Sequence, residues 1–281
     1  MDGRAELGEY LRSRRARIKP EDAGLQRYGE RRRVPGLRRE ELAQLAGVSV
    51  DYYVRFEQGK GDGVSDAIID AVAGALKLSE AETAHLHNLA RAVNPRHVAV
   101  PGRQELRPGQ RQLLDAMGDS PAYLVGRRTD MLAWNPLYAE LLGAGSLHEA
   151  GLRGRQNTAW LVFCDEEVRG RYVNWETKAQ NVVAYLRMDH GRHPGDPAFA
   201  ALIEELTERS ADFRRLWAGY EVADRTHGGY RMRHPVVGEF TVGFESFRAS
   251  NDVSLIAYTA EPGTASADAL RHLTKLVREA A

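Results

Sequence analysis

The strongest constraint on the fold is the segment 39–59, which has the pattern of two helices joined by a tight turn. Ala43 is small at the position where a second helix would cross close to the first. Gly47 can take the positive φ that a sharp turn needs. This spacing predicts a helix-turn-helix. The apolar residues that would pack its two helices together are Leu42, Leu45, Val48, Tyr53 and Phe56.

The second helix of this pattern leaves a set of side chains pointing outward near its N-terminal half. A recognition helix presents that half to base edges in the major groove of DNA. An αα-hairpin with no role in DNA binding would have similar apolar faces, but the basic surroundings favour the DNA-binding interpretation. The residues expected to face the groove are Ser49, Val50, Asp51, Tyr52 and Arg55.

Several of the predicted DNA-binding side chains have two possible roles. Arg39 opens the first helix of the pair, where backbone N–H groups and a guanidinium can hold a phosphate together, or it is simply solvated. Arg55 can reach guanine or a phosphate, or it pairs with Asp51 one turn earlier. Asp51 can accept a hydrogen bond from cytosine, or it supports the helix N-terminus.

Charge is distributed unevenly along the chain. The 39 Lys and Arg balance 39 Asp and Glu, but residues 1–60 hold fourteen basic against ten acidic residues, a local net charge of +4. Such asymmetry indicates a nucleic-acid-binding end. Arg32, Arg33 and Arg38 are also expected to bind DNA. The run Arg31-Arg32-Arg33 would clamp phosphates beside the duplex, although a solvated loop would look the same.

The pattern of the sequence changes near residue 100, where helical periodicity stops. Helical periodicity covers 39–46, 49–58, 65–76 and 79–92 and a first helix around Leu7, and Ser49, Ser65 and Ser79 precede helical runs as caps. Three prolines interrupt 94–109. We therefore predict a multidomain protein. It has an all-α five-helix helix-turn-helix domain (1–95), a linker (96–109) and an α+β domain (110–281).

The second half of the chain alternates strand and helix patterns. Strands are expected at 122–126, 131–134, 229–232, 239–247 and 253–259. Helices are expected near 136–142, 175–188, 197–208, 210–219 and 265–280. Asn135 is expected to cap the first of these helices.

The residues provide no catalytic or metal-binding constellation. One cysteine, Cys164, excludes a disulfide framework and a multi-cysteine metal site, and His190 and His193 lack a recognised ligand spacing. No glycine-rich phosphate loop follows a strand. We therefore expect neither an enzyme, a metal nor a cofactor. Short apolar runs and an N-terminus without an apolar core lead us to expect a cytoplasmic protein with no membrane span.

The block 32–43, continuing through 45–49 and 56–60, resembles MmyB-like transcriptional regulators with a helix-turn-helix of the xenobiotic-response-element type. Phe56 stands where a leucine is common in that family. The resemblance continues in the second half and covers nearly the whole chain. The matching segments there are Pro121-Ala122-Tyr123, 130–135, Asn174-Trp175-Glu176, 234–239 and 258–263.

The resemblance implies a bacterial transcription factor whose PAS-like C-terminal domain holds a small apolar ligand of fatty-acid type. Aromatic side chains suit such a site. On this interpretation Trp134, Trp160, Phe163 and Trp175 are expected to line it. Regulators with this motif bind two operator half-sites as symmetric dimers, so a homodimer on double-stranded DNA is expected.

Two other functions compete with ligand sensing. A DNA-tethered protein–protein interaction module would carry a large exposed apolar patch rather than an enclosed pocket. An enzyme fused to a DNA-binding module would carry a polar cleft with perturbed titratable groups.

Overall fold

The computed structural model describes residues 3–24, 36–60, 64–93, 104–143, 147, 156–193, 195–219, 226–249 and 252–280. The chain divides into two compact units. The first contains Met1–Pro101 and Arg187–Ala200, and the second contains Gly102–Leu186 and Ala201–Ala281. Of the predicted linker, residues 96–103 lie outside the described residues, and a helix begins at Pro108. The two units are described separately below.

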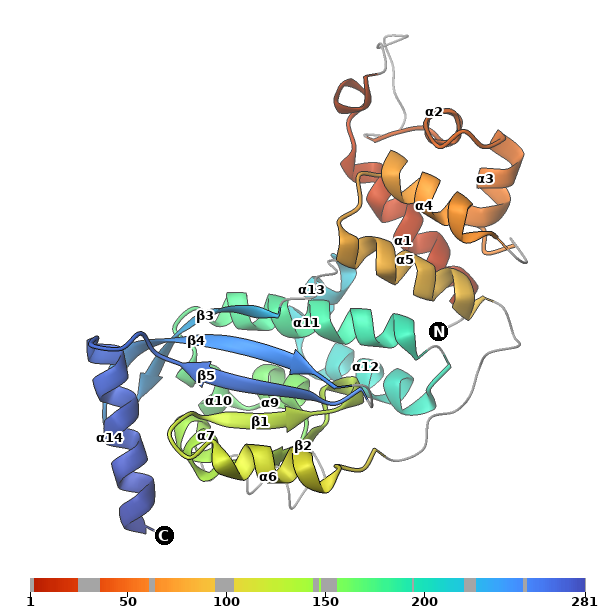
Figure 1. Cartoon of the computed structure of the whole chain (residues 1–281). Helices are drawn as coiled ribbons and strands as arrows, with labels where there is room; N and C mark the ends of the chain where they lie inside the picture. Colours follow the sequence, from red (N-terminus) through yellow and green to blue (C-terminus); the bar gives the residue numbers. More distant parts are fainter. Residues whose placement is uncertain are drawn as a thin grey trace. The chain divides into compact units, whose positions relative to one another are not determined.

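The first unit is helical, as expected. Its elements are α1 (Gly3–Arg17), the short 3-10 helix η1 (Pro20–Ala23), α2 (Arg39–Leu45), α3 (Val50–Glu57), α4 (Asp66–Ala75) and α5 (Glu80–Ala92) (Figure 1). The side chains of Leu42, Tyr53 and Phe56 are buried at their interface. Leu45 is 38% exposed, so it contributes less to the packing than its pattern predicted.

Helix caps fix the ends of these helices. The Ser49 hydroxyl accepts a hydrogen bond from the backbone N–H of Tyr52 at 3.2 Å. Ser79 and Glu82 form a reciprocal capping box at the start of α5, with distances of 3.3 and 2.9 Å. Ser65 precedes α4 but its side chain makes no capping hydrogen bond, so that expected cap is wrong.

Glycine is required at two turns of this unit. Gly47 has φ of +67°, which confirms its role in the turn between α2 and α3. Gly59 has φ of +65°, and a Cβ atom there would lie 2.8 Å from the Cα of Arg4. Both the backbone conformation and the close approach of α1 therefore exclude a larger residue.

The first unit also contains residues from far along the sequence. Arg187–Ala200 include the last turns of α11 (Trp175–Arg192) and the start of α12 (Pro197–Arg209). Within this unit His190 Nδ1 lies 2.8 Å from Glu6 Oε1, and both side chains are buried. The sequence pattern had assigned all of 110–281 to one C-terminal domain.

The second unit is built on a five-stranded antiparallel sheet with strand order β2-β1-β5-β4-β3. The C-terminal strand β5 therefore lies between β1 and β4 (Figure 1). The strands are β1 (Ala122–Val125), β2 (Met131–Trp134), β3 (His227–His234), β4 (Gly238–Arg248) and β5 (Ser254–Thr259).

Most helices of this unit lie between β2 and β3 in the sequence, and one helix precedes β1 and another follows β5. The predicted helices are present as α7 (Pro136–Leu142), α11, α12, α13 (Ala211–Ala218) and α14 (Ala265–Ala280). Three further helices had no prediction. They are α6 (Pro108–Ala116), α9 (Thr158–Cys164) and α10 (Glu166–Arg171). The α+β fold class is confirmed, whereas the PAS-like likeness stays a prediction.

Asn135 caps α7, as expected, and does more. Its Oδ1 accepts from the backbone N–H of Tyr138 at 2.9 Å and from that of Ala122 at 3.1 Å. Its Nδ2 donates to the carbonyls of Met117 and Ser120 at 2.8 and 2.7 Å. The buried Asn135 side chain thus links the start of α7 to the start of β1 and to the loop before it.

Register determines which side chains share the sheet face that the site uses. Tyr123 pairs with Ile256 across β1 and β5, and Phe244 pairs with Tyr258 across β4 and β5. Directly paired residues point to the same face. This face carries large aromatic side chains. None of the helices that the structure describes is long and apolar enough to cross a membrane.

Candidate recognition helix and ligand pocket

Helix α3 presents most of the predicted DNA-facing residues at the surface. Ser49, Asp51 and Arg55 are exposed, and Tyr52 is half-buried. Val50 is 43% exposed although it is apolar. An exposed valine on a polar helix face is suited to contact the methyl group of thymine. The structure therefore places Ser49 to Tyr52 at the start of α3 and Arg55 in its last turn.

The local pairing predicted as an alternative for Arg55 is not formed. Within the described part of the chain, neither Asp51 nor Arg55 has an ion-pair partner, although they are one turn apart. Asp51 lies in the first turn of α3, where its charge complements the helix dipole. The guanidinium of Arg55 is therefore available to a base or a phosphate.

Arg39 is engaged inside the domain. Its Nε donates to Oε2 of Glu57, and this hydrogen bond raises the pKa of the guanidinium. The Arg39 side chain is still 45% exposed, so part of it also faces solvent. Arg38 precedes α2, and its backbone N–H donates to Oε2 of Glu41 at 2.7 Å. Arg32 and Arg33 lie outside the described residues.

Glu57 is the acidic centre of the helix-turn-helix. Its side chain is fully buried, and Oε1 accepts hydrogen bonds from Arg15 of α1. Arg15 Nη1 also donates to the Leu37 carbonyl at 2.5 Å. A buried carboxylate is stable only when its charge is compensated, and two guanidinium groups do so here. The end of α3 is thereby fixed to α1 and to the start of α2.

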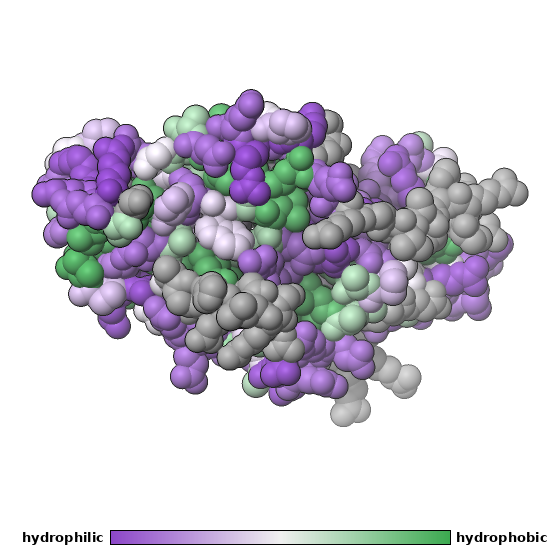
Figure 2. Space-filling model, turned by 90° about the horizontal axis from the view of Figure 1, so that it is seen from below, coloured by the Kyte–Doolittle hydropathy of each residue, from purple (hydrophilic) through white to green (hydrophobic). Residues whose placement is uncertain are grey.

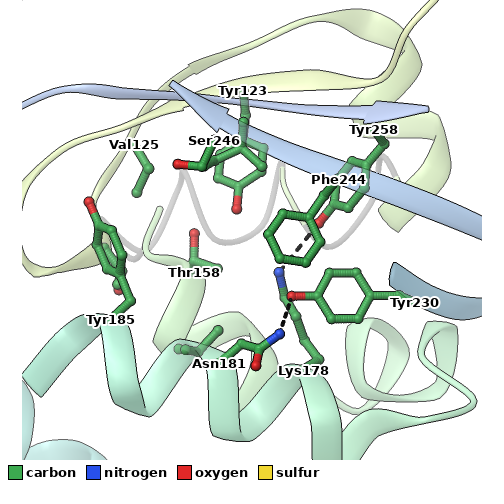
Figure 3. Close-up of a pocket in the computed structure, with 13 residues that line it drawn as sticks. Tyr123, Val125, Thr158, Lys178, Asn181, Tyr185, Tyr230, Phe244, Ser246 and Tyr258 are labelled. Atoms are coloured by element: carbon green, nitrogen blue, oxygen red, sulfur yellow. Dashed lines mark hydrogen bonds between the residues drawn. The ribbon is translucent and has the colours of Figure 1, made fainter. Parts of the chain in front are cut away.

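The second unit contains a pocket between the aromatic face of the sheet and α11 (Figure 3). Its cavity volume is about 60 Å³. A single water needs roughly 10–15 Å³, so the cavity has room for a compact ligand. The lining residues are Tyr123, Val125, Thr129, Thr158, Lys178, Asn181, Val182, Tyr185, Tyr230, Phe244, Ser246, Ile256 and Tyr258.

Aromatic contacts hold the wall of the pocket in place. Tyr230 and Phe244 stack with their ring centroids 5.0 Å apart. Asn181 Nδ2 donates to the hydroxyl of Tyr230 at 3.0 Å, linking α11 to β3. Stacked rings and a side-chain hydrogen bond restrict rotamers, so the pocket is partly pre-formed.

Lys178 is the single charged residue among those that line the pocket. Its side chain is 4% exposed, and Nζ donates to the Tyr258 hydroxyl at 3.3 Å. Nζ also lies 4.9 Å from the ring centroid of Tyr230 and 5.3 Å from that of Tyr172. Burial lowers the pKa of Lys178 from 10.5 to about 7, because the protein interior solvates an ammonium poorly.

The tyrosines near Lys178 remain neutral. Burial raises the pKa of Tyr258 and that of Tyr172 well above 10, and it also raises the pKa of Tyr123. Their hydroxyls therefore donate and accept hydrogen bonds without supplying a negative charge.

The four aromatic residues predicted from the sequence lie outside this pocket lining. Trp160 and Phe163 border a separate surface depression with Cys164, and Trp134 is a half-buried residue of β2. Trp175 packs edge-on against Phe163, and its Nε1 donates to the Val162 carbonyl at 2.9 Å. Sequence reasoning missed Lys178 and the strand tyrosines Tyr123, Tyr230 and Tyr258, which come from distant parts of the sequence and meet only in the folded sheet.

The described residues give little support for a metal site or for a large apolar docking patch. No group of three or more His, Cys, Asp or Glu there could hold a metal ion. The large exposed apolar residues of the second unit, Leu113, Val236 and Phe247, belong to three separate places in its fold. On the face seen in Figure 2, apolar groups are interrupted by hydrophilic residues.

Comparison with known families assigns both parts of the chain. Residues 106–273 match the MmyB-like transcription regulator ligand binding domain. Residues 6–86 match a helix-turn-helix domain. No curated protein matches the chain. The recognition helix lies inside the matched range 6–86, and the pocket lies inside the matched range 106–273. The chain therefore belongs to the MmyB-like transcription regulators and is a DNA-binding regulator with a C-terminal ligand-binding domain.

Proposed function

We propose that this regulator recognises a specific operator as a homodimer in the cytoplasm, and that its C-terminal domain senses a small apolar molecule of fatty-acid type. The observation that carries the sensing role is the pocket between α11 and the aromatic sheet face. Its walls are mostly hydrocarbon and aromatic, as expected of a site for an apolar ligand.

The pocket chemistry supports binding rather than catalysis. Its lining includes hydroxyl, amide and amine groups but no carboxylate, histidine or cysteine. General acid–base catalysis usually requires a pair of groups with complementary protonation states. A single amine among neutral tyrosines does not make such a pair. The regulator therefore responds to its ligand without transforming it.

Operator recognition rests on α3. Exposed Val50 and Arg55 offer an apolar contact for thymine and a donor group for guanine or phosphate. One recognition helix reads only a few base pairs, and dimers of such domains read two half-sites about one helical turn apart. A homodimer would give this chain the contact area that operator specificity requires.

Helix α11 offers a route from ligand to DNA affinity. Lys178, Asn181 and Tyr185 line the pocket from its first turns, and its last turns group with the first unit. A ligand changes DNA affinity only if it binds two arrangements of the protein with different affinity. We infer that a shift of this continuous helix distinguishes those arrangements.

The test begins with native mass spectrometry of the purified full-length protein, before and after mild organic extraction. A bound mass of a few hundred daltons that extraction removes is the expected result. Straight-chain fatty acids of six to sixteen carbons are then added back. The operator is selected from a random DNA pool, and its affinity is compared with and without the bound acid.

Two variants make the experiment specific to the pocket. Ser246→Phe fills the cavity, whereas Thr241→Phe adds the same ring on the exposed face of the same strand. Only the first should abolish acid binding, and both should keep operator affinity. If wild type binds no acid, the sensing role is refuted and partner docking gains support, while DNA binding by the first unit stands.

A further inference from the structure

Lys178 is a buried amine for which the protein supplies no counter-charge. This holds for the described part of the chain, in which no carboxylate forms an ion pair with Lys178 and its hydrogen-bond partner Tyr258 is a neutral phenol. Burying an unpaired charge is costly, and the usual remedies are deprotonation or an added anion. A ligand with a negative charge would supply the counter-charge for the Lys178 ammonium.

The other lysines show that this placement is exceptional for the chain. There are five lysines, and Lys19, Lys60, Lys77 and Lys275 are all exposed. Lysine side chains are rarely fully buried unless they are paired. The cost of enclosing Lys178 therefore has a functional explanation if the pocket is occupied by an anion.

The single charge of the pocket lies on one side of it. Lys178 gathers there with Tyr230, Phe244 and Tyr258, and the uncharged residues Val125, Tyr185 and Ser246 lie on the other side (Figure 3). The rings of Tyr230 and Tyr172 face the amine within the range in which an aromatic ring attracts a cation. The protonated amine is therefore held ready on one side, while the hydrocarbon part of a ligand would extend toward the other.

We propose that Lys178 is the head-group anchor of this pocket and makes it selective for amphiphiles with one negative charge, such as a carboxylate, over neutral molecules of the same shape. This inference rests on the proposed function, because it assumes that the pocket holds an apolar ligand. The inference adds that the charge of the ligand's head group, and not the length of its hydrocarbon chain alone, determines which molecules bind in the pocket.

Charge pairing also links binding to a proton. The groups facing Nζ are Tyr258 from β5, Tyr230 from β3 and Tyr172 after α10. Burial raises the pKa of Tyr258 and that of Tyr172 well above 10, so neither is ionised near neutral pH. An anion beside Nζ favours the protonated amine. Above pH 7, binding of a carboxylate should therefore take up a proton from solution, and binding of an alcohol should not.

The experiment compares octanoate with octan-1-ol, two probes with the same chain length. Their affinities for the full-length extracted protein are measured by titration calorimetry at pH 8 in two buffers of different ionisation heat. Wild type should bind octanoate at least tenfold more tightly than octan-1-ol, with uptake of up to one proton for octanoate only. Lys178→Met should lose the preference and the proton uptake while keeping octan-1-ol affinity within threefold.

Lys275→Met is the matched control, because it makes the same change at an exposed lysine of α14. It should behave as wild type. Circular dichroism of both variants checks that they fold, and retained octan-1-ol binding by Lys178→Met shows that its pocket is intact.

The outcomes separate this inference from the proposed function. If wild type binds both probes equally, or if Lys178→Met keeps the preference for octanoate, the anchor role is overturned and the apolar pocket stands. If wild type binds neither probe but retains a longer acid in the mass-spectrometric test, the head-group selectivity must be measured with that acid and its alcohol, and equal affinity there overturns it. If no acid of any length binds, the proposed sensing role itself fails.

Discussion

Arg15 and Glu57 form a buried ion pair across the helix-turn-helix, with Arg15 Nη2 3.0 Å and Nε 3.3 Å from the same carboxylate oxygen of Glu57. The second oxygen of Glu57 accepts from Arg39. One carboxylate without solvent exposure thus connects α1, α2 and α3. The orientation of the recognition helix depends on this cluster, which we call the Glu57 cluster.

Glu57→Ala should destabilise the first unit. It leaves two guanidinium groups without their carboxylate, and removing one partner of a buried ion pair costs about 3–5 kcal/mol. Thermal unfolding followed by calorimetry should show an earlier transition for this unit. Glu40→Ala, which removes an exposed carboxylate 3.8 Å from Arg38, should change stability by at most about 0.5 kcal/mol. Equal effects of the two substitutions would contradict a structural role for the Glu57 cluster.

Arg55→Ala and Arg39→Ala should weaken operator binding in different ways. Arg55 has no ion-pair partner among the described residues, so its loss should cost about 1–3 kcal/mol of binding free energy and leave the melting temperature unchanged. Arg39 belongs to the Glu57 cluster, so Arg39→Ala should lower the melting temperature as well. Fluorescence anisotropy with the selected operator, together with calorimetry, measures both quantities.

Arg111→Ala serves as the charge-matched control for these two variants, because it removes an exposed arginine from α6 of the second unit. It should leave operator affinity within twofold of wild type. An Arg55→Ala protein that binds as tightly as this control would place the DNA contact elsewhere.

Asn135→Ala should be strongly destabilising for the second unit. The substitution removes a helix cap and leaves buried backbone groups of Ala122, Met117 and Ser120 without their partner. With about 1 kcal/mol for each of the four hydrogen bonds, the loss should be about 3–5 kcal/mol. Chemical denaturation measures it, with the exposed Glu279→Ala as a reference that should stay near wild type. A loss below 1 kcal/mol would mean that water replaces the amide.

Lys178 should make stability depend on pH. Its pKa is about 7 in the folded protein and 10.5 when solvated, so between these values the unfolded chain binds more protons. The free energy of unfolding therefore rises with pH in that window, by at most about 1.4 kcal/mol per pH unit from this group. Below pH 7 the contribution is constant, because both states are protonated.

The measurement compares unfolding of wild type and Lys178→Met at pH 7 and pH 9. Wild type should gain up to about 2.7 kcal/mol relative to the variant over these two units. Spectra of protein labelled with ¹³C at lysine should show one of five side chains titrating near pH 7, and that signal should be missing from Lys178→Met. Five lysines that all titrate above pH 9 would contradict a desolvated amine.

The fold was largely predictable because its signals are local. Ala43, Gly47 and the apolar positions around them lie within a short stretch, so the helix-turn-helix can be identified from spacing alone. Asn135 was predicted as a cap for the same reason, since a cap and its helix are adjacent in sequence. Helix α9 escaped prediction because nearly all of its residues are buried, so the sequence shows no alternation between an apolar and a polar face, and α10 has only six residues.

The site was less predictable because it is assembled over long distances. Tyr123 and Tyr258 share the pocket only because β5 inserts next to β1, which sheet register determines and sequence spacing does not. Size alone pointed to Trp175, yet that ring packs beneath the guanidinium of Arg169, 3.5 Å from its centroid. The bond between Arg39 and Glu57 likewise joins residues eighteen positions apart.

The enclosed amine of Lys178 also gives the protein an internal reporter of occupancy. Acylating reagents attack neutral amines, and burial lowers the pKa of Lys178 to about 7, so this lysine is mostly neutral at pH 8. A small reagent that enters the pocket should therefore modify Lys178 out of proportion to its burial. Protection of this one residue, quantified by peptide mass spectrometry, would read pocket occupancy directly in cell extracts, before the ligand itself has been identified.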